Sequence, residues 1–172
     1  MATMKPMPSR AIRFSFGIRQ SWKINDHDSM DISEYPVLGT TEIWRFINDS
    51  GVSHPMHMHL VAFQVLDRDG FSTGPNGEIV PDGNPQAPPA EEQGWKDTAM
   101  VAPNEIVRVI ARFEDYEGFY PYHCHILEHE DNEMMRQFRV VPEPGEVLLL
   151  GSGILFLLAL ARRRAGRFTR HS

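Results

Sequence analysis

The sequence predicts an all-β domain with a Greek-key sandwich or barrel architecture. Apolar side chains make up 41% of the chain, which is enough to fill one core, and the length of 172 residues suits a single domain. Short runs rich in Val, Ile, Phe and Trp are repeatedly broken by Gly, Pro, Asn and Asp, as is typical of strands joined by turns. A hydrophobic helix is expected in addition at the C-terminus.

The strands are expected within residues 10–141, after an N-terminal tail of residues 1–9. The candidate strands are Ala11 to Ile18, Thr41 to Asn48, Val61 to Asp67, Ile106 to Arg112 and Phe138 to Val141. Between Asp67 and Gly94 the chain is polar and rich in Gly and Pro, so a long surface loop is predicted there. A wall of a substrate entrance is the functional alternative for this stretch.

The run His123-Cys124-His125 carries the most informative side chains. In a β-strand successive side chains face opposite sides, so Cys124 faces away from both of its histidine neighbours. His129 and Met134 follow five and ten residues after Cys124, and a loop can fold them back to its side. Cys, His and Met are three of the four ligands of a blue-copper electron-transfer site, which has two His, one Cys and a weak axial Met.

The second histidine of such a site is expected from the HPMHMH run at 54–59. His57 and His59 share a parity, so in an extended segment they face the same side, like the two histidines that flank Cys124. His54 has the opposite parity. We therefore predict that His54 completes the blue-copper site and that the two like-facing pairs form a second, imidazole-only copper cluster.

Two alternatives involve no copper. Cys124 is the only cysteine, so no intrachain disulfide can form, and a buried structural thiol is the alternative to a ligand. Zinc also accepts imidazole, although the combination with the Cys motif favours copper. His27 and His171 belong to no ligand pair and are expected to be surface residues.

Together these residues resemble the multicopper oxidases, and within them the bacterial spore-coat laccase and bilirubin oxidase type. The resemblance covers most of residues 10–141 and rests on Trp22-Lys23-Ile24-Asn25, Gly39-Thr40-Thr41-Glu42-Ile43-Trp44, the HPMHMHLVAFQVLDR run, Gly94-Trp95-Lys96-Asp97-Thr98 and HCHILEHEDNEMM. It implies that residues 10–141 are the third and last cupredoxin domain of such an enzyme. Many relatives have Gly before the axial residue, whereas this chain has Glu133.

The resemblance also implies a role for each ligand. The type 1 copper is assigned to His54, Cys124, His129 and Met134, the type 2 copper to His57, and the type 3 pair to His59, His123 and His125. Cys124 then carries single electrons from the type 1 site toward the cluster. Glu130 resembles the family acid that relays protons to O2, and its alternative is a solvated acid of the loop.

The implied reaction couples one-electron oxidation of phenols, aromatic amines, bilirubin-like pigments or metal ions to four-electron reduction of O2 to water. The trinuclear cluster of this family takes twice as many histidines as this chain supplies. We expect N-terminal cupredoxin domains or a partner chain to provide the other half, and the isolated chain to be inactive as an enzyme. The alternatives are a stand-alone blue-copper electron carrier and a non-functional fragment.

Residues 142–172 resemble the PEP-CTERM sorting signal of Gram-negative bacteria. Pro142-Glu143-Pro144 precedes an uncharged apolar span, 147–161, and a block of arginines begins at Arg162. As a helix the span is ~23 Å long, short of a hydrocarbon core of ~30 Å but workable with snorkelling arginines or a thin bilayer. A buried helix of the domain is the alternative. The resemblance implies export, transient anchoring in the inner membrane, processing by an exosortase, and a copper domain on the periplasmic or cell-surface side.

The charge balance agrees with this division. The net charge is −6, and five of the 17 basic residues lie from Arg162 onward, so the rest of the chain is strongly acidic and indicates no nucleic-acid partner. Met1 to Gln20 contains no apolar segment of a secretory signal peptide. For an exported protein we therefore expect additional sequence upstream.

Overall fold

In the computed structural model, the described residues are 7–16, 22–143 and 145. Their strands are β1 (Ser9–Phe16), β2 (Trp22–Ile24), β3 (Thr40–Asn48), β4 (His54–Met58), β5 (Phe63–Thr73), β6 (Ile79–Pro81), β7 (Trp95–Lys96), β8 (Thr98–Val101), β9 (Glu105–Phe113), β10 (Gly118–Cys124) and β11 (Met135–Val140). A short 3-10 helix, η1 (Ala90–Glu92), and one turn of α-helix, α1 (Leu127–Glu130), lie between them. The all-β prediction is confirmed.

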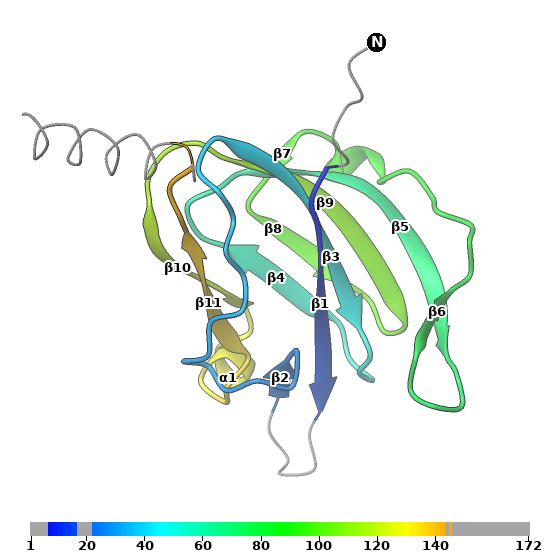
Figure 1. The fold of residues 1–172 in the computed structure, drawn as a ribbon. Helices are drawn as coiled ribbons and strands as arrows, with labels where there is room; N and C mark the ends of the chain where they lie inside the picture. Colours follow the sequence, from blue (N-terminus) through cyan, green and yellow to red (C-terminus); the bar gives the residue numbers. More distant parts are fainter. Residues whose placement is uncertain (1–6, 17–21, 144, 146–172) are drawn as a thin grey trace, which may run out of the picture. The chain divides into compact units, whose positions relative to one another are not determined.

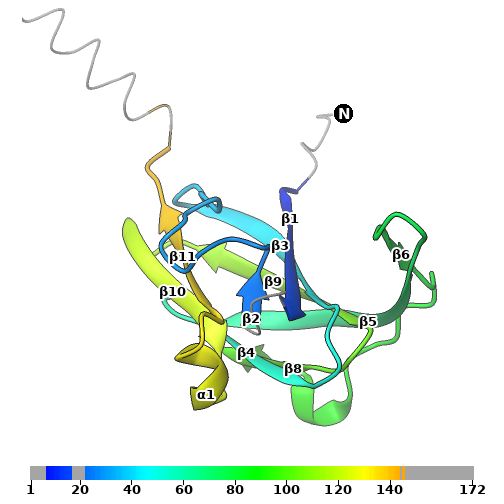
Figure 2. The ribbon, with the colours of Figure 1, turned by 90° about the horizontal axis from the view of Figure 1, so that it is seen from below.

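The strands form two sheets, which curl around a common interior (Figures 1 and 2). Within the described residues, the larger sheet has the order β2-β1-β3-β9-β5-β6, with β7 paired to β5, and the smaller sheet has the order β11-β10-β4-β8. β1 runs parallel to β3, and the other strand pairs are antiparallel. Neighbours far apart in sequence, such as β4 and β10, are thus brought side by side.

The core lies between the sheets because apolar and polar side chains alternate along the strands. In β3, Trp44 and Phe46 are buried and Arg45 between them is exposed. The Trp44 ring lies 6.0 Å from the Phe113 ring of β9 and 5.6 Å from the Phe138 ring of β11, measured between centroids. The contact with Phe138 joins the larger sheet to the smaller one, and such tilted and edge-on contacts between aromatic rings stabilise the core.

The five predicted strands correspond to β1, β3, β5, β9 and β11, with shifted ends. The last two residues of the first one, 17 and 18, lie outside the described residues. The short strands β2, β6, β7 and β8 were not predicted, because segments of two to four residues carry too few alternations to be recognised.

The long surface loop predicted between Asp67 and Gly94 is wrong in its first part. β5 continues to Thr73, and β6 folds back on it as an antiparallel partner. β9 supplies the backbone partners for this polar stretch, and Asp67 lies opposite Arg108, with Nε of Arg108 donating to Oδ1 of Asp67 at 2.6 Å. Cross-strand pairing thus stabilises residues whose composition alone indicates a turn.

Val141 is the last residue of the compact unit that holds the strands, and Pro142 begins a second unit. The predicted hydrophobic span 147–161 and the arginines after it lie outside the described residues. Among the helices that the structure does describe, none is both long and apolar enough to cross a bilayer.

Candidate metal centre

The smaller sheet brings the two histidine-rich segments together. β4 and β10 are antiparallel neighbours, and their register sets His57 opposite His123 and Met56 opposite Cys124. Directly opposite residues point to the same face of a sheet, so His57 and His123 share one face and Cys124 the other. His54 lies two residues before Met56 and therefore shares the face of Cys124.

His54, Cys124 and His129 bring three donor atoms together on the inner face. Sγ of Cys124 lies 3.6 Å from Nδ1 of His54 and 3.6 Å from Nδ1 of His129. The two Nδ1 atoms are 3.2 Å apart. A point equidistant from three atoms at such separations lies roughly 2 Å from each, close to the metal–nitrogen and metal–sulfur bonds of about 2.0–2.3 Å found in proteins. The three donors therefore fit one metal ion.

α1 and the turn after it return His129 and Met134 to Cys124. The amide of His129 donates to the carbonyl of Ile126 at 3.0 Å, and the amide of Met134 donates to the carbonyl of His129 at 2.9 Å. The amide of Cys124 in turn donates to the carbonyl of Met134 at 3.0 Å. Met134 is fully buried. The backbone thus holds Met134 beside Cys124 and His129.

Glu133, which precedes Met134, has a φ of 69°, in the left-handed region that favours glycine. Its carboxylate forms an ion pair with Lys23 of β2, and the ammonium of Lys23 also lies 2.6 Å from Oδ1 of Asp28. Hydrogen bonds to Asp28 and then to Glu133 raise the pKa of Lys23. The side chain of Glu133, at the position where many relatives have glycine, thus links the loop that precedes Met134 to β2 through an ion pair.

The surroundings keep the two imidazoles neutral at pH 7. Burial, reinforced by the nearby His129, lowers the pKa of His54 to about 4. Burial also lowers the pKa of His129 and raises the pKa of the Cys124 thiol. Both histidines therefore offer lone pairs to a metal, whereas the thiol releases a proton on binding one.

Trp22 covers this cluster, although no functional role was predicted for it from the sequence. Its ring lies 4.8 Å from the His54 ring and 4.5 Å from the His129 ring, measured between centroids. The only signal for it was its place in the Trp22-Lys23-Ile24-Asn25 motif. The indole thus packs against the rings of both histidines.

A second group of donors lies on the other face of β4 and β10. The ligand nitrogens of His57, His59 and His123 all lie within 4.8 Å of one another, and Nε2 of His59 is 3.3 Å from Nε2 of His123. His125 lies beside this group, with its ring centroid 5.5 Å from that of His57 and 5.7 Å from that of His123. The structure thus places the donor nitrogens of three of the four predicted cluster histidines within 4.8 Å of one another, and the fourth, His125, lies beside them.

Two of these imidazoles are oriented by acceptors on their Nδ1 side. Nδ1 of His57 lies 3.0 Å from the carbonyl oxygen of Asp97 and 3.0 Å from Oγ1 of Thr98, whose own proton is donated to Oδ1 of Asp97. Nδ1 of His123 lies 3.2 Å from a carboxylate oxygen of Glu130 and 3.1 Å from the carbonyl oxygen of Cys124. Because these partners only accept, Nδ1 carries the proton in both rings, and the Nε2 lone pairs are free for a metal. Glu130 therefore contacts a cluster histidine directly.

The two clusters differ in exposure. His54, Cys124 and Met134 of the first are fully buried. In the second, His123 is buried, whereas His59 and His125 are exposed. The second cluster is open on one side.

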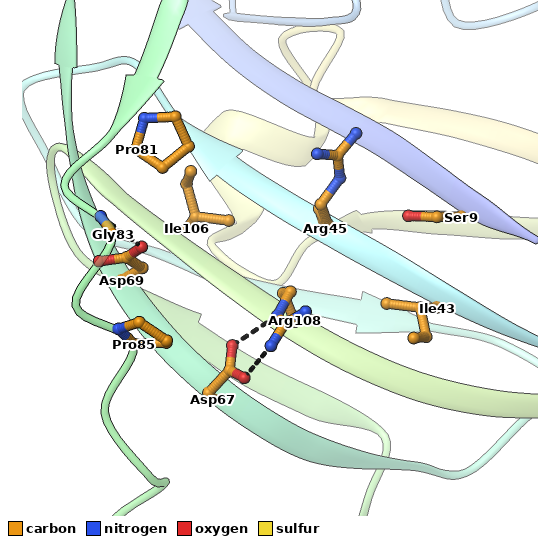
Figure 3. Close-up of a pocket in the computed structure, with 10 residues that line it drawn as sticks. All are labelled: Ser9, Ile43, Arg45, Asp67, Asp69, Pro81, Gly83, Pro85, Ile106 and Arg108. Carbon is orange, nitrogen blue, oxygen red and sulfur yellow. Dashed lines mark hydrogen bonds and ion pairs between the residues drawn. The ribbon is translucent and has the colours of Figure 1, made fainter. Parts of the chain in front are cut away.

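A separate cavity of about 410 Å³ lies on the larger sheet, lined by Ser9, Ile43, Arg45, Asp67, Asp69, Pro81, Gly83, Pro85, Ile106 and Arg108 (Figure 3). It contains no Cys or His. Asp67 is paired with Arg108, and the carboxylate of Asp69 accepts the amide of Gly83 at 3.2 Å. This cavity is thus not a site for a soft metal.

Comparison with known proteins identifies the family. The sequence profile described as "Multicopper oxidase" matches residues 5–144. The chain belongs to the multicopper oxidase family. A laccase of Bacillus subtilis (strain 168) is 48% identical over 108 residues, which are 61% of this chain and 21% of that protein. A laccase of Haloferax volcanii is 50% identical over 114 residues, which are 66% of this chain and 17% of that protein.

Solved multicopper oxidases share the fold. The enzyme McoA of Aquifex aeolicus aligns with a TM-score of 0.64 and 30% identity over 81% of this chain and 30% of its own. A multicopper oxidase of Pediococcus acidilactici aligns with a TM-score of 0.66 and 31% identity over 84% of this chain and 28% of its own. The cupredoxin-like fold is thereby confirmed. This multicopper oxidase chain spans about a fifth of the length of the Bacillus laccases it matches.

The donors present fit the metal that a multicopper oxidase implies. A thiolate, two imidazoles and a thioether form the soft donor set that copper takes in electron-transfer sites, and an imidazole-only group also suits copper. Copper is therefore the metal assigned to this chain.

Proposed function

We propose that this domain collects single electrons from a small-molecule reductant and delivers them to the site of O2 reduction in a laccase-like multicopper oxidase. The observation that supports this most directly is that Cys124 and His123 are consecutive residues of β10 and belong to different donor groups. A covalent path through one peptide bond thus joins the two groups. Bound copper supplies the one-electron redox chemistry at both.

In this proposal His54, Cys124, His129 and Met134 form the type 1 site. The type 2 copper is assigned to His57 and the type 3 pair to His59, His123 and His125. The short distance of 3.3 Å between Nε2 of His59 and Nε2 of His123 favours a shared ion for these two. The ring of His125 lies 5.7 Å from that of His123, which favours binding of His125 to the other ion of the type 3 pair.

Glu130 is proposed as the proton relay to the O2 site. Its carboxylate contacts His123 at 3.2 Å, and its side chain is 24% exposed, so it reaches both the cluster and water. A carboxylate in this position accepts a proton from solvent and releases it on the cluster side. The same contact also orients His123, so the two roles need separate tests.

The remaining cluster histidines are proposed to come from N-terminal cupredoxin domains or from a partner chain, with this domain in the third position. The exposed His59 and His125 support this, because the second cluster is open to an approaching surface. The chain also covers only 21% of the Bacillus subtilis laccase. Phenols, aromatic amines, pigments and metal ions are the proposed reductants.

The test is to load the 172-residue chain with copper and record its visible absorption and electron paramagnetic resonance spectra, with Cys124→Ser as the matched variant. An intense blue band in the wild type and none in Cys124→Ser supports the type 1 assignment. Absence of the band in the wild type, or its survival in Cys124→Ser, contradicts it.

A stand-alone electron carrier is the second candidate, because all four proposed type 1 ligands come from this one chain. Oxygen uptake with a phenolic reductant tests whether this chain assembles an O2-reducing cluster by itself. Uptake by the copper-loaded chain supports an assembled cluster. A blue band that is reduced by the phenol without oxygen uptake supports the carrier, or a domain that needs its partners.

We further propose that residues 142–172 act as a PEP-CTERM-like signal, which anchors the exported domain transiently on the periplasmic side until an exosortase-like enzyme processes it. The support is the order of Pro142-Glu143-Pro144, the apolar span 147–161 and the arginines. A periplasmic reporter fused to residues 142–172 should stay with the membrane fraction and be cleaved only when an exosortase is present. Release of the uncleaved fusion into the soluble fraction contradicts the proposal.

A further inference from the structure

Ser50 contacts the side of His54 that faces away from the first cluster. Its Oγ lies 2.8 Å from Nε2 of His54, while Nδ1 of the same ring faces Cys124 and His129. An imidazole binds a metal through the nitrogen that carries no proton. The contact with Ser50 therefore bears on whether His54 is ready to act as a ligand.

Asn48 fixes the direction of the hydrogen bonds around Ser50. Asn48 is fully buried, and its Nδ2 group donates to the carbonyl of Val52 at 2.8 Å and to the carbonyl of Val101 at 3.0 Å. Its Oδ1 therefore points to Ser50, where it accepts the amide at 3.1 Å and the hydroxyl at 2.6 Å. The amide cannot be reversed without setting its N–H groups against the N–H of Ser50.

The hydroxyl of Ser50 has a single proton to donate. Besides His54, its partners are Oδ1 of Asn48 at 2.6 Å and the carbonyl of Val52 at 3.2 Å, and both of these only accept. With its proton engaged by one of these oxygens, Ser50 accepts from Nε2–H of His54. The proton of the ring is then on Nε2, and the lone pair of Nδ1 points at the donor triangle.

We propose that Ser50, held by Asn48, is a positioning residue that presets His54 in its metal-binding tautomer. This inference rests on the proposed type 1 copper site and specifies what prepares one of its ligands. A hydrogen bond from the distal N–H of a ligand histidine fixes the ring and makes the metal-bound nitrogen a better donor. Ser50 thereby stabilises the oxidised form of the bound copper and lowers the reduction potential of the site.

The first test needs no metal. In the metal-free 172-residue chain labelled with ¹⁵N-histidine, the two ring nitrogens of each neutral imidazole have distinct chemical shifts, and His54→Gln assigns the signals of His54. The expected result is a protonated Nε2 and an unprotonated Nδ1 in the wild type, and a mixture of tautomers in Ser50→Ala. A protonated Nδ1 in the wild type, or an unchanged tautomer in Ser50→Ala, overturns the inference.

The second test uses copper(II) added to the same variants. Ser50→Ala should bind copper about 10–100-fold more weakly than the wild type and have a higher reduction potential, and Ser50→Thr, which keeps the hydroxyl, should restore both. Ser53→Ala is the matched control, because Ser53 lies exposed in the same loop. If the wild type has a blue band and Ser50→Ala matches its affinity and potential, the positioning role is overturned while the type 1 site stands. If the wild type binds no copper, the proposed function itself fails.

Discussion

Sγ of Cys124 lies 3.6 Å from Nδ1 of His54, although 70 residues separate them in the chain. The two residues belong to β10 and β4, which pair side by side in the smaller sheet. Two donors that lie far apart in the sequence are thus brought together by the pairing of β4 with β10.

Metal binding at the first cluster should stabilise the fold only while Cys124 is present. Cobalt(II) serves as the ion, because it does not oxidise the thiol, and at a concentration 100-fold above the dissociation constant it should add about 2.7 kcal/mol to the free energy of unfolding. Thermal unfolding with and without cobalt measures this. Cys124→Ser should lose most of the gain, and an equal gain in that variant would place the ion elsewhere.

The metal-free fold should lose stability as the pH falls from 6.5 toward 4. The pKa of His54 is about 4 in the folded chain and 6.5 in its ordinary state, so the unfolded chain binds a proton that the folded chain excludes. The contribution of neutral His54 to the free energy of unfolding is therefore fully present above pH 6.5 and is lost as the pH falls toward 4. The loss amounts to roughly 3 kcal/mol. Urea unfolding across this range measures the slope. His54→Gln should flatten it, and an unchanged slope contradicts the assignment to His54.

Removing the carboxylate of Glu130 should weaken the second cluster. Glu130→Ala leaves Nδ1 of His123 without its carboxylate partner at 3.2 Å, and zinc affinity at the three histidines should fall about 10–100-fold. Glu130→Gln keeps an acceptor and should retain most of the affinity. Glu128→Ala, an exposed neighbour, is the control. Affinity in Glu130→Ala equal to that of the wild type would exclude the orienting role and leave only the proton relay.

Removing only one partner of the buried ion pair between Arg136 and Glu34 should strongly lower the free energy of unfolding. Arg136 is 0% and Glu34 4% exposed, and the pair lies at 3.2 Å, with the hydroxyl of Tyr122 donating to the same carboxylate at 3.1 Å. Arg136→Met leaves a buried charge unpaired and should lower the free energy of unfolding by about 3–5 kcal/mol.

Urea unfolding provides that measurement, and the matched control is Arg139→Met on the same strand, where the side chain is exposed and the change should stay within about 0.5 kcal/mol. Neutralising the partner as well, in Glu34→Gln with Arg136→Met, should recover part of the loss. A double variant no more stable than Arg136→Met alone would show that packing around the arginine, rather than the unpaired charge, is responsible.

Much of the fold was predictable because its strands are long and alternate regularly. Trp44 and Phe46 flank an exposed Arg45 in β3, and this period of two is visible in the sequence. The extension of β5 past Asp67 was not predictable, because its polar residues are stabilised by β9, a partner that local composition does not reveal.

Some features of the candidate site were likewise predictable from the sequence. The residue types and spacings of Cys124, His129 and Met134 predicted a soft metal site by themselves, because Cys, His and Met are the ligand types that a blue-copper site uses. Strand parity also separated His54 from His57. These are local properties, fixed by the order of side chains along an extended backbone.

Only the tertiary structure decided which atoms meet and what surrounds them. The contacts of Trp22 with the His54 and His129 rings, of Asp97 with His57, and of Asn48 with Val101 join segments whose register is set by pairing across the sheets. The use of Nδ1 in the first cluster and Nε2 in the second also depends on neighbours that come from other strands and loops. The sequence determines which donors are available, whereas packing determines their orientation, because a side-chain rotamer and a tautomer are selected by contacts that form only when distant segments fold together.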